Sequence, residues 1–184
     1  EHKYGMHIWN AIAIEGAYSQ MFRNQVNGKN WKGLYDTNLG NFFSQGLEKN
    51  MDQLSDTGKL IFLMGTYMTQ KYNGKHYASA QNQANWHTNA FNEKLSHFDA
   101  LLMPTTPTCA FPAMNNNFDI KENVQNALGM IHNTATFDVT GHPSLSVPCG
   151  TKGDLPIGAM IIGNHQSDDI VLKVGKAIEK ICLR

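Results

Sequence analysis

Histidine is one residue type in this sequence that could hold a metal ion or move a proton, because imidazole does both near neutral pH. No histidine pair has the HExxH form, and none lies near a cysteine at the spacing of a zinc site. We therefore predict no metal site and expect most histidines on the surface or hydrogen-bonded in the core. The eight histidines are His2, His7, His76, His87, His97, His132, His142 and His165.

A serine nucleophile would need a base beside it and a sharp turn that exposes its oxygen. The composition allows a Ser/His/Asp triad, but the sequence contains no G-x-S-x-G motif. Ser144 and Ser146 alternate with apolar residues, which is typical of a strand. Residues 150–153 lack the spacing of a phosphate-binding loop, and a turn is expected there. No motif in the sequence indicates a self-contained serine hydrolase.

The predicted secondary structure that would position these serine and histidine residues changes near Asp99, from helices to short strands. Before it, apolar residues at helical spacing predict helices, with Ser55-Asp56 as a capping pair for one of them. The predicted helical segments are 6–23, the end of 27–50 after a packed loop, the residues after Ser55, and about 76–97.

After Asp99, short apolar runs predict strands over 100–103, 144–147 and 157–163. The other segments are an irregular, proline-rich stretch over 104–119, helical character over 121–131, a polar loop over 150–156, and a last helix capped by Ser167. Three short strands are few for a free-standing α/β sheet. We therefore expect another chain to complete the sheet.

Composition and charge exclude several classes of protein. Hydrophobic residues make up 41% of the chain and charged residues 16%, which allows a globular core. Lys and Arg number 15, as do Asp and Glu, so we expect no nucleic-acid partner and no membrane-binding patch. Three cysteines without a CxxC pair, and no N-x-S/T sequon, favour a cytoplasmic protein with reduced thiols. The first residues resemble no signal peptide and lack an initiator methionine, so we expect the chain to begin inside a longer gene product.

Two sequence blocks in the second half carry a resemblance. The first reads Phe98-Asp-Ala-Leu-Leu-Met-Pro-Thr-Thr-Pro107, and the second runs from Asn133-Thr-Ala-Thr-Phe-Asp-Val-Thr-Gly-His-Pro-Ser-Leu-Ser-Val-Pro-Cys-Gly150 to Leu155-Pro-Ile-Gly-Ala-Met-Ile-Ile-Gly163. Both resemble the carboxy-terminal hallmarks of the amidase signature family. The motifs Trp9-Asn-Ala-Ile-Ala-Ile-Glu-Gly-Ala17, Trp31-Lys-Gly-Leu-Tyr-Asp-Thr37, Leu54-Ser-Asp-Thr-Gly-Lys-Leu60 and Tyr77-Ala-Ser-Ala-Gln81 resemble the enantioselective amidases found beside nitrile hydratases. The resemblance covers nearly the whole chain and is weakest over 114–126.

The resemblance implies an α/β fold, part of an α/β/α sandwich with a mixed central sheet. Residues 1–184 would be the carboxy-terminal portion of a single amidase signature domain, with 1–98 mainly helical and 99–184 alternating strands and helices. The family's serine nucleophile, its bridging serine with a cis peptide and its lysine base come from the amino-terminal half, around a Gly/Ser-rich signature that this sequence lacks. The resemblance therefore implies no catalytic residue and no cofactor on this chain.

A partner amino-terminal chain would carry the triad, and the assembled enzyme would hydrolyse a small-molecule amide to carboxylate and ammonia. The complex of this chain with its partner could in turn form a dimer. Taken alone, this chain is expected to be inactive and poorly soluble, because its interface with the partner would be apolar.

Four residues are candidates for substrate binding. Without context, Trp9 and Ile131 would be ordinary core residues, but by resemblance they match a tryptophan and an isoleucine on the acyl side of the pocket. Apolar walls there favour aliphatic or aromatic carboxamides. The tRNA-dependent amidotransferases hold the substrate amine with an acidic residue near the place of Ile131, which argues against glutamine as substrate. Asn133 and Phe137 are the other two candidates.

Two alternative functions stay open on the sequence. One is an enzyme of the same family that cleaves hydrazides, esters or peptide-like amides. The other is a non-catalytic binding subunit of a degenerate amidase. The presence or absence of the Gly/Ser-rich signature in the partner chain would decide between this subunit and an enzyme.

Overall fold

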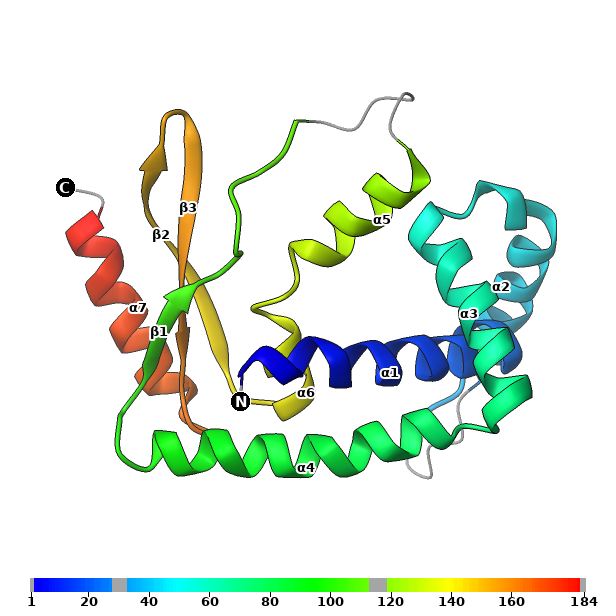
Figure 1. Cartoon of the computed structure of the whole chain (residues 1–184), viewed down its shortest axis with the longest axis horizontal. Coiled ribbons are helices and arrows are strands. Elements are labelled where there is room, and N and C mark those ends of the chain that lie inside the picture. The colour runs from blue at the N-terminus through cyan, green and yellow to red at the C-terminus, as the bar shows by residue number, and fades with distance from the viewer. Residues whose placement is uncertain (1, 28–32, 113–118, 183–184) are drawn as a thin grey trace. The chain divides into compact units, whose positions relative to one another are not determined.

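The computed structural model describes residues 2–27, 33–112 and 119–182 (Figure 1). The chain divides into two compact units, Glu1–Trp9 with Asn82–Arg184, and Asn10–Gln81. Helices α1 (Gly5–Ala17) and α4 (Lys75–Leu95) each contribute residues to both units. The other elements of the first unit are η1 (His2–Tyr4), β1 (Leu101–Pro104), α5 (Ile120–Gly129), α6 (Ala135–Thr140), β2 (Ser144–Lys152), β3 (Leu155–Ile162) and α7 (Asp168–Cys182).

The sheet of the first unit has the order β1-β3-β2. Ile162 of the central strand pairs with Leu101 on one side and with Ser144 on the other. Every described pairing is antiparallel, so the mixed character expected of the family's sheet is not seen within these strands. β1 and β2 are therefore the outer strands among the described residues.

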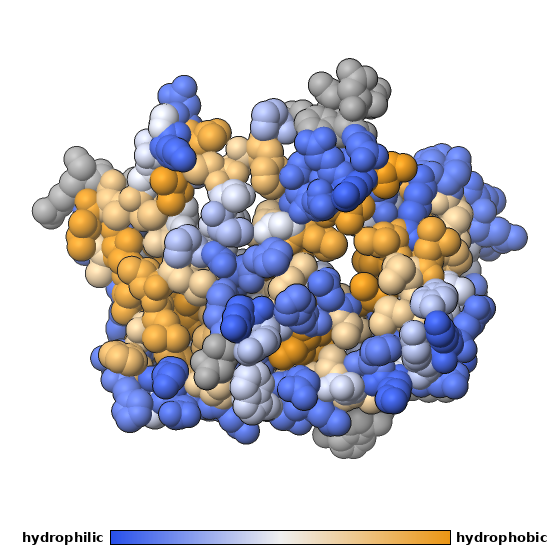
Figure 2. All heavy atoms as spheres, in the orientation of Figure 1, coloured by the Kyte–Doolittle hydropathy of each residue, from blue (hydrophilic) through white to orange (hydrophobic). Residues whose placement is uncertain are grey.

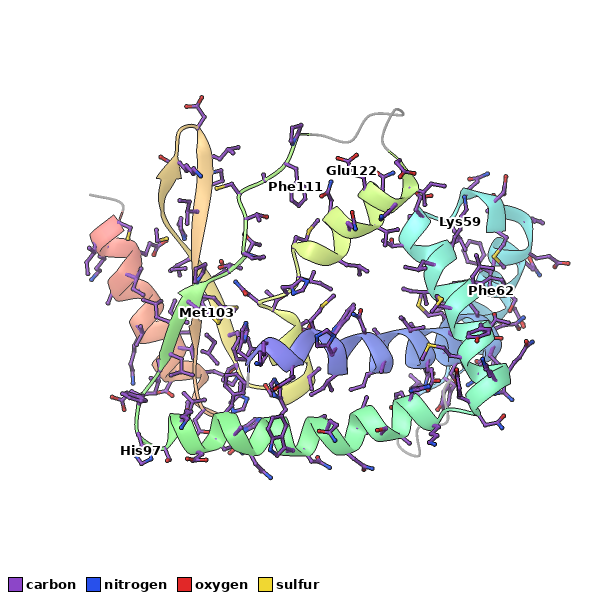
Figure 3. The ribbon with its side chains drawn as sticks, viewed as in Figure 1. Lys59, Phe62, His97, Met103, Phe111 and Glu122 are labelled. Carbon is purple, nitrogen blue, oxygen red and sulfur yellow. The ribbon has the colours of Figure 1, made fainter. Side chains whose placement is uncertain are left out.

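Alternation along β3 produces three layers, because successive side chains of a strand point to opposite faces. Met160 and Ile162 pack toward α4 and α6, and Ile161 packs toward α7. Met103 of β1, labelled in Figure 3, packs against the first of these clusters. The two clusters are Phe91, Phe137, Met160 and Ile162 on one face, and Val147, Ile161 and Val171 on the other. This arrangement confirms the predicted α/β/α layering.

All described elements of the second unit are helices. Besides parts of α1 and α4, they are the π-helix η2 (Tyr18–Arg23), α2 (Thr37–Asn50), the 3-10 helix η3 (Met51–Gln53) and α3 (Asp56–Tyr72). The ring of Phe62 lies 5.1 Å from that of Phe22 and 6.2 Å from that of Tyr18. Ser55 caps α3 as predicted, since its Oγ accepts a hydrogen bond from the N–H of Gly58 at 3.2 Å.

The structure corrects two predictions in the second half of the chain. The polar loop predicted over 150–156 is wrong, because β2 pairs with β3 as far as Lys152 and Leu155. Only Gly153 and Asp154 separate the strands, and the φ of 61° at Gly153 suits a tight turn. Helix α6 forms where the sequence patterns predict no helix. The first two residues of the Trp31 motif and part of the proline-rich segment lie outside the described residues.

Candidate functional site

A cavity of about 350 Å³ opens between the end of β1, α6 and β2 in the first unit. We call it the sheet cavity. The two blocks that resemble the amidase signature family meet here, since β1 belongs to the first and α6, β2 and β3 to the second. The residues that line it are Thr105, Thr134, Phe137, Asp138, His142, Ser144, Ser146 and Met160.

Short hydrogen bonds tie the walls of the sheet cavity together. The hydroxyl oxygens of Thr105 and Ser146 lie 2.6 Å apart, which joins the end of β1 to β2. Nδ2 of Asn133 donates to the carbonyl oxygen of Pro104 at 2.9 Å. Asn133 thereby fixes the segment before α6 to the same end of β1. These two hydrogen bonds hold the end of β1, β2 and the segment before α6 in fixed positions around the cavity.

The sheet cavity contains a serine, a histidine and an aspartate, but the histidine does not serve the serine. His142 Nδ1 lies 2.8 Å from Oγ1 of Thr140, and its Nε2 lies 3.1 Å from Oδ1 of Asn92. Ser144 Oγ instead donates to the backbone carbonyl of His142 at 3.2 Å. Because both ring nitrogens are engaged elsewhere, this geometry is not that of a Ser/His/Asp triad.

Burial and two neighbouring imidazoles keep His142 neutral. The side chain is 4% exposed, and its ring lies 4.1 Å from that of His165. Burial is the largest cause, followed by repulsion from His165 and His87, and together they lower the pKa of His142 from 6.5 to about 4. A neutral imidazole suits its role as a bridge between Thr140 and Asn92.

His142 should make the stability of the fold depend on pH. The unfolded chain takes up the proton near pH 6.5 and the folded chain only near pH 4, so stability is complete above pH 6.5 and is lost as the pH falls through that window. We expect a loss of about 2 kcal/mol between about pH 7 and about pH 4.5. Urea unfolding at both values measures it.

A histidine substitution isolates this effect from other groups that titrate. The His142→Asn variant should lose less stability on acidification than the unaltered chain, whereas the exposed His132→Gln control should behave like the unaltered chain. Equal pH dependence in all three proteins would contradict the assignment.

The structure gathers two of the four predicted site residues at the sheet cavity. Phe137 lines it and is only 5% exposed, and Asn133 binds its edge at Pro104. Ile131 lies half-buried in the turn before α6, where its carbonyl oxygen accepts a hydrogen bond from the N–H of Ala135 at 2.9 Å. It is not among the residues that line the cavity.

Trp9 also lies outside the cavity lining, half-buried on α1. The start of α1 is close to α6, because Gly5 leaves no room for a side chain against Thr136. Trp9 follows Gly5 by four residues and therefore lies on the same side of the helix. Helix spacing from Gly5 thus puts Trp9 on the α6 side of α1.

The hydroxyl pair of Thr105 and Ser146 and the His142 bridge were not predicted as site features. The only signal was that Thr105 and His142 fall inside the two resembling blocks. Among the described residues, no group of three His, Cys, Asp or Glu could hold a metal ion. No helix in the described part of the chain is long and apolar enough to cross a membrane.

Comparison with known families shows to which protein family the chain belongs. The family model named Amidase matches residues 1–172. The chain belongs to the amidase family. The amidase resemblance drawn from the sequence blocks is therefore confirmed.

Relatives of this amidase chain include both short and long proteins. It is 42% identical over 178 residues to the "Uncharacterized protein in nthA 5'region" of Rhodococcus erythropolis, covering 97% of this chain and 89% of that protein. It is 39% identical over 168 residues to the enantioselective amidase of Rhodococcus rhodochrous, covering 91% of this chain and 32% of that enzyme. It is 27% identical over 189 residues to a glutamyl-tRNA(Gln) amidotransferase subunit of Methanococcoides burtonii, covering 97% of this chain and 36% of that subunit.

Solved structures share the fold of this amidase chain. A glutamyl-tRNA(Gln) amidotransferase subunit of Thermotoga maritima matches with a TM-score of 0.63 at 24% identity, over 97% of this chain and 32% of that one. A bacterial aryl acylamidase of the amidase signature family matches with a TM-score of 0.63 at 20% identity, over 98% and 34%. The chain thus spans most of one relative but about a third of the enantioselective amidase, the amidotransferase subunits and the aryl acylamidase.

Proposed function

We propose that this chain is the carboxy-terminal portion of a single amidase domain and that it acts with a partner amino-terminal chain. The assembled enzyme would hydrolyse a carboxamide C–N bond to carboxylate and ammonia. The observation that carries this proposal is the family match over residues 1–172 in a chain that spans only 32% of the enantioselective amidase. The catalytic serines and lysine would then lie on the partner.

The exposed apolar surface of the first unit supports a partner chain. The outer strand β1 leaves Leu102 64% exposed, and α7 leaves Leu172 60% exposed. Figure 2 shows hydrophobic side chains gathered over β1 and α7. Exposed apolar patches of this kind mark interaction sites, and an outer strand offers free backbone groups for further pairing. Both features suit a sheet that continues into another polypeptide.

The proposed division of labour follows from the chemistry of amide hydrolysis. A serine on the partner attacks the carbonyl carbon, the C–N bond breaks with transfer of a proton to the leaving ammonia, and water releases the acid. A lysine can act as the base only when desolvation and neighbouring groups lower its pKa. The apolar face of this chain would exclude water from that lysine.

Trp9, Ile131, Asn133 and Phe137 would shape the acyl side of the substrate pocket. The position of Trp9 on the α6 side of α1 supports its role in the pocket. The hydrogen bond from Asn133 to the carbonyl oxygen of Pro104 supports a role for Asn133 at the edge of the sheet cavity. The apolar Ile131 favours uncharged acyl groups. Phe137 would act mainly as the wall behind them.

Replacing Trp9 should change which amides the assembled enzyme prefers. We expect the Trp9→Ala variant to change the ratio of kcat/KM for benzamide and propionamide by about tenfold, because a lost apolar contact affects bulky and small acyl groups unequally. Release of ammonia measures both rates. The control is Trp86→Ala, a half-exposed tryptophan on α4. An equal fall for both amides would contradict the pocket assignment.

The partner is tested directly by purifying the native assembly through an affinity tag on this chain. We expect a co-purifying chain with a Gly/Ser-rich signature, ammonia release from propionamide by the complex, and none by this chain alone. Alanine at the partner's signature serine should abolish the activity. An isolated chain that is monomeric, stable and hydrolytic would overturn the two-chain proposal.

The same experiment separates the alternatives. A partner that lacks the signature serines would favour a non-catalytic binding subunit. Activity on a hydrazide or an ester that exceeds activity on every amide tried would favour the related hydrolases.

A further inference from the structure

The sheet cavity has a small set of polar groups, and most of them are already used by the fold. Its volume of about 350 Å³ lies near the lower end of the range for ligand pockets, about 300–1,000 Å³, so it suits a small molecule. Four residues with hydroxyl groups, one histidine and one aspartate line it. The donors and acceptors that stay free among them decide which chemical group the cavity can bind.

Two of the four hydroxyl groups have no proton to offer. Ser144 Oγ donates to the carbonyl oxygen of His142 at 3.2 Å, and Thr134 Oγ1 donates to that of Ile131 at 3.2 Å. Because a hydroxyl carries a single proton, both of these donors are used inside the fold. The imidazole of His142 is likewise engaged at both ring nitrogens.

The other two hydroxyl groups keep one proton free. Thr105 and Ser146 share one hydrogen bond, with 2.6 Å between their oxygens, and it uses one of their two protons. Neither hydroxyl has a second partner among the residues that the structure describes. The pair meets beside Gly158 of β3, where a Cβ would lie 2.8 Å from Oγ of Ser146 and 2.9 Å from Oγ1 of Thr105. One O–H donor is therefore left for a molecule in the cavity that both residues line.

Acceptors also line the sheet cavity. The side chain of Asp138 is exposed, and its carboxylate forms no hydrogen bond or ion pair within the described ranges. The oxygens of Ser144 and Thr134 keep lone pairs after donating. A bound hydroxyl group can therefore accept the free proton of the pair and donate its own proton to one of these oxygens. An ammonium group cannot accept that proton, and an alkyl group can neither accept nor donate.

We propose that the sheet cavity binds hydroxylated acyl groups and that Thr105 and Ser146 give the assembled enzyme a preference for hydroxy amides. This inference rests on the proposed amidase function, in which Phe137 forms the wall behind the acyl group. The substrate hydroxyl accepts the free proton of the pair, whereas an unsubstituted acyl group leaves that donor unpaired. An unpaired donor in a closed site costs free energy, so the hydroxylated substrate is favoured.

Four small amides test the preference on the complex with its partner chain at pH 7. Propionamide, lactamide, 3-hydroxypropionamide and alaninamide share one carbon chain and carry only hydrogen, a hydroxyl or an ammonium group on it. The better of the two hydroxy amides should exceed propionamide in kcat/KM by about tenfold, as expected of one hydrogen bond whose loss leaves a donor unpaired. Alaninamide should not exceed propionamide. Release of ammonia measures all four rates.

A double variant assigns the preference to the hydroxyl pair. Thr105→Val together with Ser146→Ala removes both hydroxyl groups and should bring the ratio of hydroxy amide to propionamide to about one. Each single variant keeps one hydroxyl with its own proton and should keep part of the preference. The matched control is Ser144→Ala, which should keep the full ratio because its proton is already donated to His142. A merely structural role of the pair would lower all four rates alike.

The outcomes separate this inference from the amidase function itself. Hydrolysis of propionamide with no gain for either hydroxy amide, or a preference that survives the double variant, would overturn the inference and leave the amidase function standing. Faster hydrolysis of alaninamide than of both hydroxy amides would also overturn it, in favour of a cation site. A complex inactive on all four amides would overturn both. If circular dichroism shows that the double variant does not fold, Thr105→Ala with Ser146→Ala removes the same hydroxyls without a β-branched residue.

Discussion

Phe137→Ala is expected to lower the free energy of unfolding by about 3–5 kcal/mol, the range for removal of a buried phenylalanine. Phe137 is 5% exposed and packs with Phe91, Met160 and Ile162. Its ring meets that of Phe91 edge to face, with centroids 5.3 Å apart. Since small domains are stable by about 5–15 kcal/mol, this single change should bring the fold close to its limit. Urea unfolding followed by circular dichroism measures the loss.

A matched phenylalanine separates burial from residue type. Phe98 is 60% exposed, and Phe98→Ala should change stability by less than about 0.5 kcal/mol. Phe137→Leu should cost only about 1 kcal/mol, because most of the buried volume remains. If Phe137→Ala unfolded like the Phe98 variant, Phe137 would line the cavity without supporting the core.

The strand at 157–163 could be predicted from its local pattern, whereas the α/β/α layering was implied by the family resemblance. The apolar run 157–163 predicts a buried strand, and β3 indeed supplies both cores through Met160, Ile161 and Ile162. A run that is apolar at every position has no polar face, so it must be covered on both sides. The sequence alone therefore carries the information for a central strand.

The hairpin and α6 could not be predicted as easily. Pro148 and Gly150 are poor strand residues, and they lie at the irregularity where β2 shifts register against β3. The pair Gly153-Asp154 was the available hairpin signal. Helix α6 is short, six residues, and includes the β-branched Thr136, so its helical propensity is low. Gly141, with a φ of 72°, was the signal for its end.

The site depends on contacts that no local pattern contains. Thr105 and Ser146 are 41 residues apart in sequence, and Asn92 and His142 are 50 apart. Only the resemblance of the second block to the amidase signature family pointed to Asn133 and Phe137. Residue type alone could not single them out, because amide and aromatic side chains occur throughout the chain. The bond from Asn133 to Pro104 appears only once β1 and α6 are packed. Sequence reasoning therefore named two residues that lie at the sheet cavity, Asn133 and Phe137, and missed the hydrogen bonds of its walls.

Gly5→Ala should destabilise the fold strongly, although it adds only one methyl group near the start of the chain. A Cβ at residue 5 would lie 2.8 Å from both Cα and Cβ of Thr136 and would overlap its Oγ1. Backbone must move to relieve this contact, so we expect a loss of about 2–3 kcal/mol. The shift should also weaken the bond from Thr136 Oγ1 to the carbonyl oxygen of His2, now 3.2 Å. Urea unfolding of the variant measures the cost.

Two comparisons decide whether the contact with α6 is the cause. Gly129→Ala, in the same unit, has nothing within 4 Å of its added Cβ and should be neutral or slightly stabilising. Thr136→Ala removes the hydroxyl but not the backbone, so it should restore only part of the loss in Gly5→Ala. Because Trp9 lies on the same side of α1 as Gly5, the Gly5 variant should also alter the preference between benzamide and propionamide in the assembled enzyme. A destabilised Gly5 variant with unaltered preference would place Trp9 outside the substrate pocket.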